Sequence, residues 1–218
     1  MMTPRIWIAA VALAALSACG TMGGGMPGAD ALKSRLGKLT GRAPAAAPAA
    51  PVVDITKAPP GEVLLVTIMS RNAVAPLTKT AQNGTTVTWI SPGRVSLTLQ
   101  DGIVIATRGL NEDLMGADIT GVRAALSAGG GSANRTHSYL NSEDQIQLRE
   151  VACVITRDGP EPVATVTGAR DAVKYTEACR GKAIAFTNVY WLDPVDGSLV
   201  QSRQAIAPST GFLQINPL

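Results

Sequence analysis

Residues 95–107 read Val95-Ser96-Leu97-Thr98-Leu99-Gln100-Asp101-Gly102-Ile103-Val104-Ile105-Ala106-Thr107. The first half alternates apolar and polar residues, which is the period-two pattern of a half-buried strand. Asp-Gly between two apolar runs is the strongest short signal for a β-hairpin, because both turn residues adopt a positive φ. The stretch therefore predicts two antiparallel strands joined by a tight turn, and it indicates a mainly β fold.

Similar apolar runs, bounded by turn residues, recur on both sides of this hairpin. Ser91-Pro92-Gly93 predicts a turn before it, and Arg157-Asp158-Gly159-Pro160 predicts a turn that joins a later strand to Val163–Thr167. Gly121–Ala128 predicts a helix, whereas Asp171–Cys179 fits either a helix or a strand. The other expected strands are 62–70, 85–90, 146–155, 183–191, 199–206 and 212–216. About ten strands at this spacing predict an antiparallel sandwich or partly closed barrel with one or two short helices.

The N-terminus has the anatomy of a secretory signal peptide, with Arg5, an apolar run and then small residues. As a helix, the run from Ile6 to Leu16 spans about 16 Å, against roughly 30 Å of hydrocarbon in a bilayer, so it is too short to be a stable anchor. Leu16-Ser17-Ala18-Cys19 resembles a lipobox. We therefore expect cleavage before Cys19 and acylation of its thiol, which would anchor a bacterial lipoprotein stably because it carries several acyl chains. The alternative is an exported protein with an incidental cysteine.

These features divide the chain into a signal peptide at 1–18, a lipidated tether at 19–60 and a single β-rich periplasmic domain at 61–218. The tether is rich in Gly, Ala and Pro and lacks the large apolar residues that would offset the entropy of ordering it. Gly20 follows the cysteine where an aspartate would indicate inner-membrane retention, which favours the periplasmic face of the outer membrane.

Charge and composition argue against a nucleic-acid partner. Without Arg5, the mature chain has 18 basic and 16 acidic residues, a net charge of +2, which is too small to indicate a nucleic-acid partner. Aromatic residues make up only 4% of the chain. Trp89, Tyr190 and Trp191 could form one aromatic cluster, but core packing is the more common use of such residues.

Cys153 and Cys179 are the two cysteines that remain once Cys19 is lipidated. In an oxidising compartment such a pair is a disulfide candidate, worth about 3–4 kcal/mol in the chain-entropy model. Two buried free thiols are the alternative.

No catalytic or metal site emerges from the remaining residues, and no cofactor is expected. His137 is the chain's one histidine, and without a nucleophile elbow or a second metal ligand it is expected to be an ordinary strand or loop residue. The best candidate for a carboxylate pair is the cluster of Asn111, Glu112, Asp113 and Asp118. Its position after a hairpin favours a structural role in turns and caps.

Three segments together resemble the YjbF/GfcB-type lipoproteins of exopolysaccharide and group 4 capsule operons. They are 97–114, the run Phe186-Thr187-Asn188-Val189-Tyr190-Trp191, and Ser202-Arg203-Gln204. The resemblance extends from about Gly61 to the C-terminus, and Cys153 and Cys179 stand where that family tends to carry a pair. It implies a mainly β periplasmic domain that works beside an outer-membrane β-barrel and other polysaccharide-export proteins. It supplies no catalytic residues.

The leading hypothesis is a non-enzymatic accessory lipoprotein of polysaccharide secretion that binds a protein partner or the polysaccharide. A polysaccharide-modifying enzyme that uses Glu112 or Asp113, and a purely structural envelope lipoprotein, are the two alternatives.

Overall fold

The computed structural model describes residues 54–55 and 57–218. The expected signal peptide, Cys19 and most of the expected tether lie outside these residues. Within the described part of the chain, no helix is long and apolar enough to cross a bilayer.

The described residues form fourteen strands, one short 3-10 helix and one α-helix. The helices are η1 (Met69–Arg71) and α2 (Thr120–Ser127). The strands are β1 (Val63–Ile68), β2 (Ala73–Asn83), β3 (Thr86–Ile90), β4 (Ser96–Gln100), β5 (Ile103–Arg108), β6 (Gly116–Asp118), β7 (Gly131–Leu140), β8 (Ile146–Pro160), β9 (Val163–Thr165), β10 (Gly168–Arg170), β11 (Val173–Arg180), β12 (Ala185–Leu192), β13 (Leu199–Ala207) and β14 (Gly211–Pro217).

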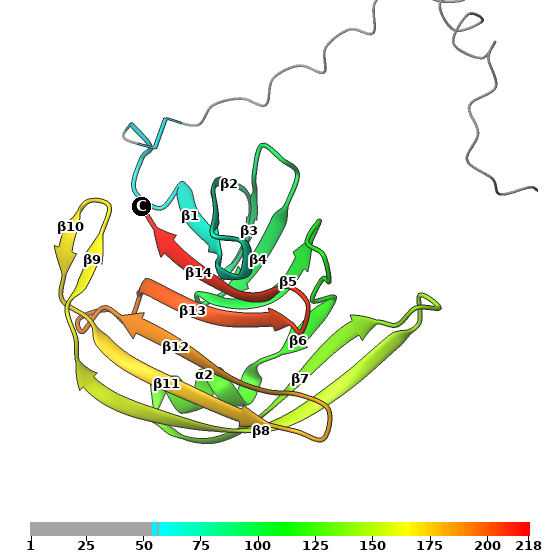
Figure 1. Cartoon of the computed structure of the whole chain (residues 1–218). Coiled ribbons are helices and arrows are strands. Elements are labelled where there is room, and N and C mark those ends of the chain that lie inside the picture. Colours follow the sequence, from blue (N-terminus) through cyan, green and yellow to red (C-terminus); the bar gives the residue numbers. More distant parts are fainter. Residues whose placement is uncertain (1–53, 56) are drawn as a thin grey trace, which may run out of the picture. The chain divides into compact units, whose positions relative to one another are not determined.

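Twelve of the strands make one antiparallel sheet, in the order β5-β4-β3-β2-β1-β14-β13-β12-β11-β8-β7-β6. This sheet curls around the core (Figure 1), and its two ends meet where the Thr107 amide donates to the Leu114 carbonyl at 2.9 Å. The prediction of a mainly β, partly closed barrel is therefore confirmed, with more strands than expected. The predicted 95–107 hairpin is also confirmed, as β4 and β5, and Asp101 and Gly102 both have positive φ.

Two predictions about the later strands were wrong. Residues 157–160 do not form a turn, because β8 continues through them to Pro160. Lys174 pairs with Gly159 and Tyr175 with Arg157, so Asp158 is the extra residue of a β-bulge. Residues 163–167 do not pair with β8 either, since β9 pairs with β10 in a separate two-stranded sheet. The ambiguous segment 171–179 is a strand, β11.

The core lies inside the curled sheet. Its largest cluster joins residues of β1, β2, β3, β4, β5, β7, β13 and β14, among them Leu64, Leu97, Leu213 and Ile215. Helix α2 covers one part of the interior and buries Val122 and Ala125.

A buried glutamine fastens edge strand β5 to the middle of the sheet. Gln204 of β13 is fully buried and accepts from the Val104 amide at 2.8 Å. Its Nε2 donates to the Gly102 carbonyl at 2.8 Å and to Ser202 Oγ at 2.9 Å. One side chain thus satisfies two backbone groups on a strand edge that no further strand covers.

We expect Gln204→Leu to lower the free energy of unfolding by about 2–4 kcal/mol, because the substitution leaves a buried amide and a buried carbonyl without partners. Urea unfolding of the purified protein measures the effect. Gln147→Leu, at an exposed position of β8, is the control and should change stability by less than about 0.5 kcal/mol. Equal stability of the two variants would contradict this role for Gln204.

Candidate functional site: a polar cleft above a buried ion pair

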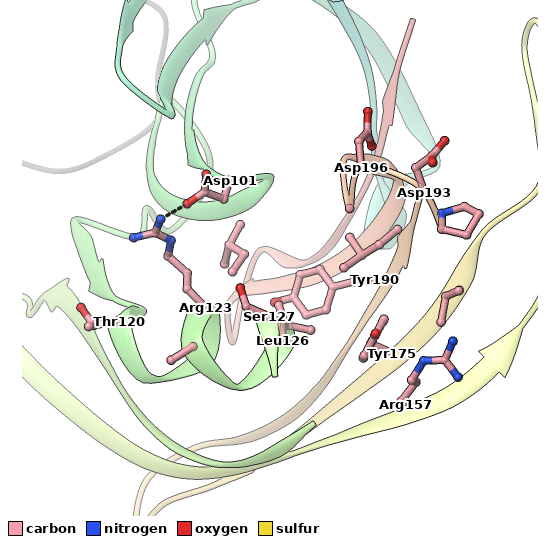
Figure 2. Close-up of a pocket in the computed structure, with 16 residues that line it drawn as sticks. Asp101, Thr120, Arg123, Leu126, Ser127, Arg157, Tyr175, Tyr190, Asp193 and Asp196 are labelled. Carbon is pink, nitrogen blue, oxygen red and sulfur yellow. Dashed lines mark ion pairs between the residues drawn. The ribbon is translucent and has the colours of Figure 1, made fainter. Parts of the chain in front are cut away.

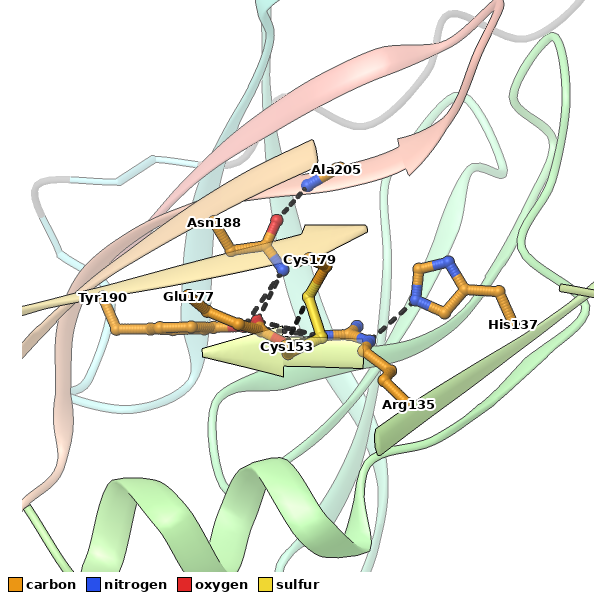
Figure 3. Close-up of a disulfide and its surroundings, with 8 residues drawn as sticks. All are labelled: Arg135, His137, Cys153, Glu177, Cys179, Asn188, Tyr190 and Ala205. Atoms are coloured by element: carbon orange, nitrogen blue, oxygen red, sulfur yellow. Dashed lines mark hydrogen bonds and ion pairs between the residues drawn. A yellow bond between two sulfur atoms is a disulfide. The ribbon is translucent and has the colours of Figure 1, made fainter. Parts of the chain in front are cut away.

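A cluster of buried polar side chains lies on the inward faces of β7, β11 and β12 (Figure 3). Its members are Arg135 and His137 from β7, Glu177 from β11, and Asn188 and Tyr190 from β12, each at most 1% exposed. Because alternate residues of a strand point to the same face, each pair two positions apart enters the interior together.

The centre of this cluster is an ion pair between Arg135 and Glu177. Arg135 Nη1 lies 3.2 Å from Glu177 Oε2 and 3.3 Å from Oε1. The same Oε2 accepts from Asn188 Nδ2 at 2.7 Å and from the Tyr190 hydroxyl at 2.6 Å. These extra hydrogen bonds offset the cost of removing the carboxylate from water.

The ionisation of the cluster follows from its burial and its charges. Burial is the largest single effect and would lower the pKa of Arg135, but the negative charge of Glu177 and the interactions with Tyr190 together outweigh it and raise that pKa. Burial, together with the charge of Glu177, raises the pKa of Tyr190 well above its ordinary value. The arginine therefore stays charged and the phenol stays protonated, as the hydrogen bonds to Glu177 require.

A hydrogen-bonded chain continues from this pair to β13. Arg135 Nε donates to His137 Nε2 at 2.7 Å, so the imidazole proton is on Nδ1. That nitrogen donates to the Tyr139 oxygen at 2.8 Å, and the Tyr139 hydroxyl donates to the Ile206 carbonyl at 2.8 Å. Burial, and then the positive charges of Arg135 and Arg149, lower the pKa of His137 to about 3. Burial raises the pKa of Tyr139 to about 12.

Cys153 and Cys179 form a disulfide beside the cluster (Figure 3). They are directly opposite each other in β8 and β11, and both are 1% exposed. Cys179 Sγ lies 3.3 Å from Glu177 Oε1, but it has no hydrogen to donate because both sulfurs are oxidised. For the same reason the group of Cys153, Glu177 and Cys179, which is compact enough to surround a metal ion, offers no thiolate ligand.

An open cleft of about 680 Å³ lies over this cluster, between α2 and strands β11 and β12 (Figure 2). Tyr190 belongs to both features, because it lines the cleft while its hydroxyl is bound to Glu177. The bulge in β8 keeps Arg157 opposite Tyr175, and both residues line the cleft. Arg123 of α2 and Asp101 form an ion pair on the facing wall (Figure 2).

The acidic residues predicted from the sequence lie outside this cleft and hold loops. Asp113 Oδ1 accepts from Thr107 Oγ1 at 2.8 Å and from the Leu110 amide at 3.1 Å, and Oδ2 accepts from the Gly109 amide at 2.9 Å. These hydrogen bonds give Asp113 the role of a turn residue.

Glu112 and Asn111 join the same loop to the turn after β13. Glu112 Oε2 accepts from the Ser209 amide at 3.2 Å and from Ser209 Oγ at 2.9 Å. Asn111 Nδ2 donates to Ser209 Oγ at 3.2 Å. Asp118 instead ends β6, just before α2, where it accepts from the amide of Thr120, the first residue of that helix, at 3.0 Å. No hydrogen bond or ion pair between described residues joins Asp118 to Glu112 or Asp113.

The single aromatic cluster does not form. Trp89 belongs to the main core and Tyr190 to the group that packs against α2. Trp191 packs against Val163 and Val200, because neighbouring residues of a strand point to opposite faces. The three residues therefore do not share one cluster, whereas core packing, the favoured use, is confirmed for Trp89 and Tyr190.

Neither the buried ion pair nor the cleft was predicted from the sequence. The only available signal was polar and charged residues at alternating positions of otherwise strand-like segments, as in Arg135, His137 and Tyr139. Such a pattern indicates an exposed face as readily as a buried network, so it does not identify the site without the strand register.

Comparisons with known proteins agree with this fold. The family model described as "Group 4 capsule polysaccharide lipoprotein gfcB, YjbF" matches residues 46–218. The crystal structure of the hypothetical lipoprotein YmcC from Escherichia coli (K12) is similar with a TM-score of 0.60 and 16% identity, over 71% of this chain and 80% of that chain. At this identity the likeness shows a shared fold. No curated protein matches the chain.

We expect Glu177→Gln to destabilise the protein by about 3–5 kcal/mol, because it leaves the buried charge of Arg135 without a counter-charge. The double variant Arg135→Met with Glu177→Gln removes both charges, and it should recover part of this loss. Chemical unfolding of the wild type, the two single variants Glu177→Gln and Arg135→Met, and the double variant measures the difference. If Arg135→Met lowers the free energy of unfolding by the same amount in the wild type and in the Glu177→Gln variant, the two residues are not coupled.

The buried His137 makes stability depend on pH. Its pKa is about 3 in the folded protein and 6.5 ordinarily, so the unfolded chain takes up a proton between these values while the folded chain does not. Stability from this group is complete above pH 6.5 and falls by about 1.4 kcal/mol per pH unit as the pH drops toward 3. Between pH 7 and pH 5, the free energy of unfolding should fall by about 2 kcal/mol more in the wild type than in His137→Gln. An equal pH dependence would contradict a neutral buried histidine.

Proposed function

This chain belongs to the YjbF family of group 4 capsule polysaccharide lipoproteins, and from that membership we propose that it is a non-enzymatic accessory factor of exopolysaccharide or capsule secretion. We further propose that lipid on Cys19 anchors it to the periplasmic face of the outer membrane. The family match over residues 46–218 carries the proposal, because it spans the β domain rather than a short motif.

The N-terminal sequence supports the anchor. The proposed order is a signal peptide at 1–18, a tether at 19–60 and the β domain at 61–218. A flexible tether of about 40 residues has an r.m.s. reach on the order of 35 Å, so the domain would work at a distance from the lipid surface. The partners proposed within that reach are an outer-membrane β-barrel, other export proteins and the polysaccharide itself.

The geometry of the acidic residues favours a binding role over an enzymatic one. Glu112 and Asp113 were the candidate acid and base, and their carboxylates accept hydrogen bonds from neighbouring backbone amides and hydroxyls. A general base must instead face the proton that it removes from the substrate. These contacts support a structural role for both residues.

Complementation of a gene-deletion strain tests the proposal. We expect the deletion to reduce secreted polymer, and the wild-type gene to restore it. Cys19→Ser should leave the protein unacylated and outside the membrane fraction, and should restore less secretion, because the domain is no longer held near its partners. Metabolic labelling with palmitate, membrane fractionation and polymer measurement give the three readouts.

The double variant Glu112→Gln with Asp113→Asn separates the accessory factor from an enzyme. It keeps the size of both side chains and one oxygen acceptor on each, so we expect secretion and polymer composition as in the wild type. Altered polymer composition with normal protein levels would support the enzyme. Normal secretion from the deletion strain would contradict the proposed function and support a purely structural envelope protein.

A further inference from the structure

The cleft between α2 and strands β11 and β12 is lined in part by polar side chains that take no part in holding the fold together. We infer that it is a binding site for a short, uncharged segment of polysaccharide. This inference rests on the proposed function, which it extends by naming a site and a ligand class. A cavity of about 680 Å³ is within the range that binds small organic ligands.

Several polar groups at the cleft are available to a ligand. Arg157 forms no ion pair with any described residue, and the hydroxyls of Ser127 and Tyr175 have no hydrogen-bond partner in the described part of the chain. All three residues line the cleft. Sugars carry hydroxyls that both donate and accept, so they match a surface that offers hydroxyls and a guanidinium.

Part of the remaining lining is apolar. Ile103, Leu126, Val173 and Leu192 contribute to the walls, and the Tyr175 side chain is half-buried among them. A pyranose ring has apolar C–H faces as well as hydroxyls, so it fits a site that mixes aliphatic and aromatic surface with a few polar groups. A highly charged ligand would leave this apolar surface without a partner.

The charges of the cleft argue against a polyanion. Three carboxylates line it, from Asp101, Asp193 and Asp196, against two guanidinium groups, from Arg123 and Arg157. Arg123 is already paired with Asp101. The cleft therefore has no excess of positive charge to attract an acidic chain, and it suits an uncharged one.

The cleft is also held in one shape, which lowers the cost of binding. Tyr190 on its floor is fixed by hydrogen bonds to Glu177 and Asn188 at 2.6 and 3.3 Å. On the rim, Asp193 accepts from Arg170 at 3.1 Å and from the Val195 amide at 2.8 Å. A site of fixed shape with unpaired polar groups is what recognition of a repeating sugar unit requires.

Binding measurements on the full-length lipidated protein in detergent test this inference. The probe is the mixture of short oligosaccharides released by partial hydrolysis of the polymer that the host strain secretes. We expect binding that does not change between low and high NaCl, as for an uncharged ligand. Ser127→Trp, which places an indole in the cleft, should weaken binding by at least about tenfold. Arg157→Ala should weaken it by about threefold to tenfold, through the loss of its hydrogen bonds.

Ser132→Trp is the matched control. Ser132 is an exposed serine of β7 that does not line the cleft, so the same substitution there should leave binding unchanged. Circular dichroism and thermal unfolding establish that each variant is folded.

The outcomes separate this inference from the proposed function. No binding by the wild type, equal binding by Ser127→Trp, or binding that high salt abolishes would each overturn the uncharged-glycan site. If Ser127→Trp fails to restore secretion while the wild type binds no oligosaccharide, the cleft holds a protein segment, and the inference is again wrong. Normal secretion by the deletion strain contradicts the proposed function alone.

Discussion

The interior of this protein is organised around one buried ion pair. Transferring Arg135 and Glu177 from water into a protein core costs several kcal/mol for each ion, and their mutual attraction offsets this only when further hydrogen bonds complete both groups. Here Asn188 and Tyr190 complete the carboxylate. The guanidinium is completed by His137 and by the Val104 carbonyl at 3.2 Å. The strands that carry these residues, β5, β7, β11 and β12, are therefore linked through a single group of charges.

The disulfide and the buried side chains of Gln204 and Arg135 fix the positions of the strands around this ion pair. The bond between Cys153 and Cys179 joins directly opposed residues of β8 and β11, so it fixes the register of the strand that carries Glu177 two residues earlier. A slip by one residue would turn Glu177 to the outer face. On the other side, Gln204 and Arg135 bind the amide and carbonyl of Val104. These side chains thus tie edge strand β5 to β13 and β7 across the interior, where no ladder joins them.

The parts of the fold that could be predicted from the sequence are those that local residues determine. The hairpin of β4 and β5 was predicted because Asp101-Gly102 specifies its own turn and each strand alternates in polarity. Strand β7 was missed because its inward face carries Arg135 and His137, which read as polar surface unless their partners on β11 and β12 are known. Arg157-Asp158-Gly159-Pro160 has the composition of a turn, but pairing with β11 continues through it and converts it into a bulge. The site itself depends on the register of several strands, so it follows from tertiary structure alone.

The distribution of titratable groups explains why the cleft suits recognition better than proton transfer. His137 is buried away from solvent with a pKa of about 3, so it carries no exchangeable charge near neutral pH. Among the carboxylates that line the cleft, Asp101 is paired with Arg123 and Asp193 with Arg170. Asp196 accepts from the Ser198 amide at 2.8 Å, which lowers its pKa and makes it a weaker base. The groups left to meet a ligand are hydroxyls and one guanidinium, which hold a molecule by hydrogen bonds. A cleft lined by such groups therefore suits the binding of an uncharged chain better than acid–base catalysis.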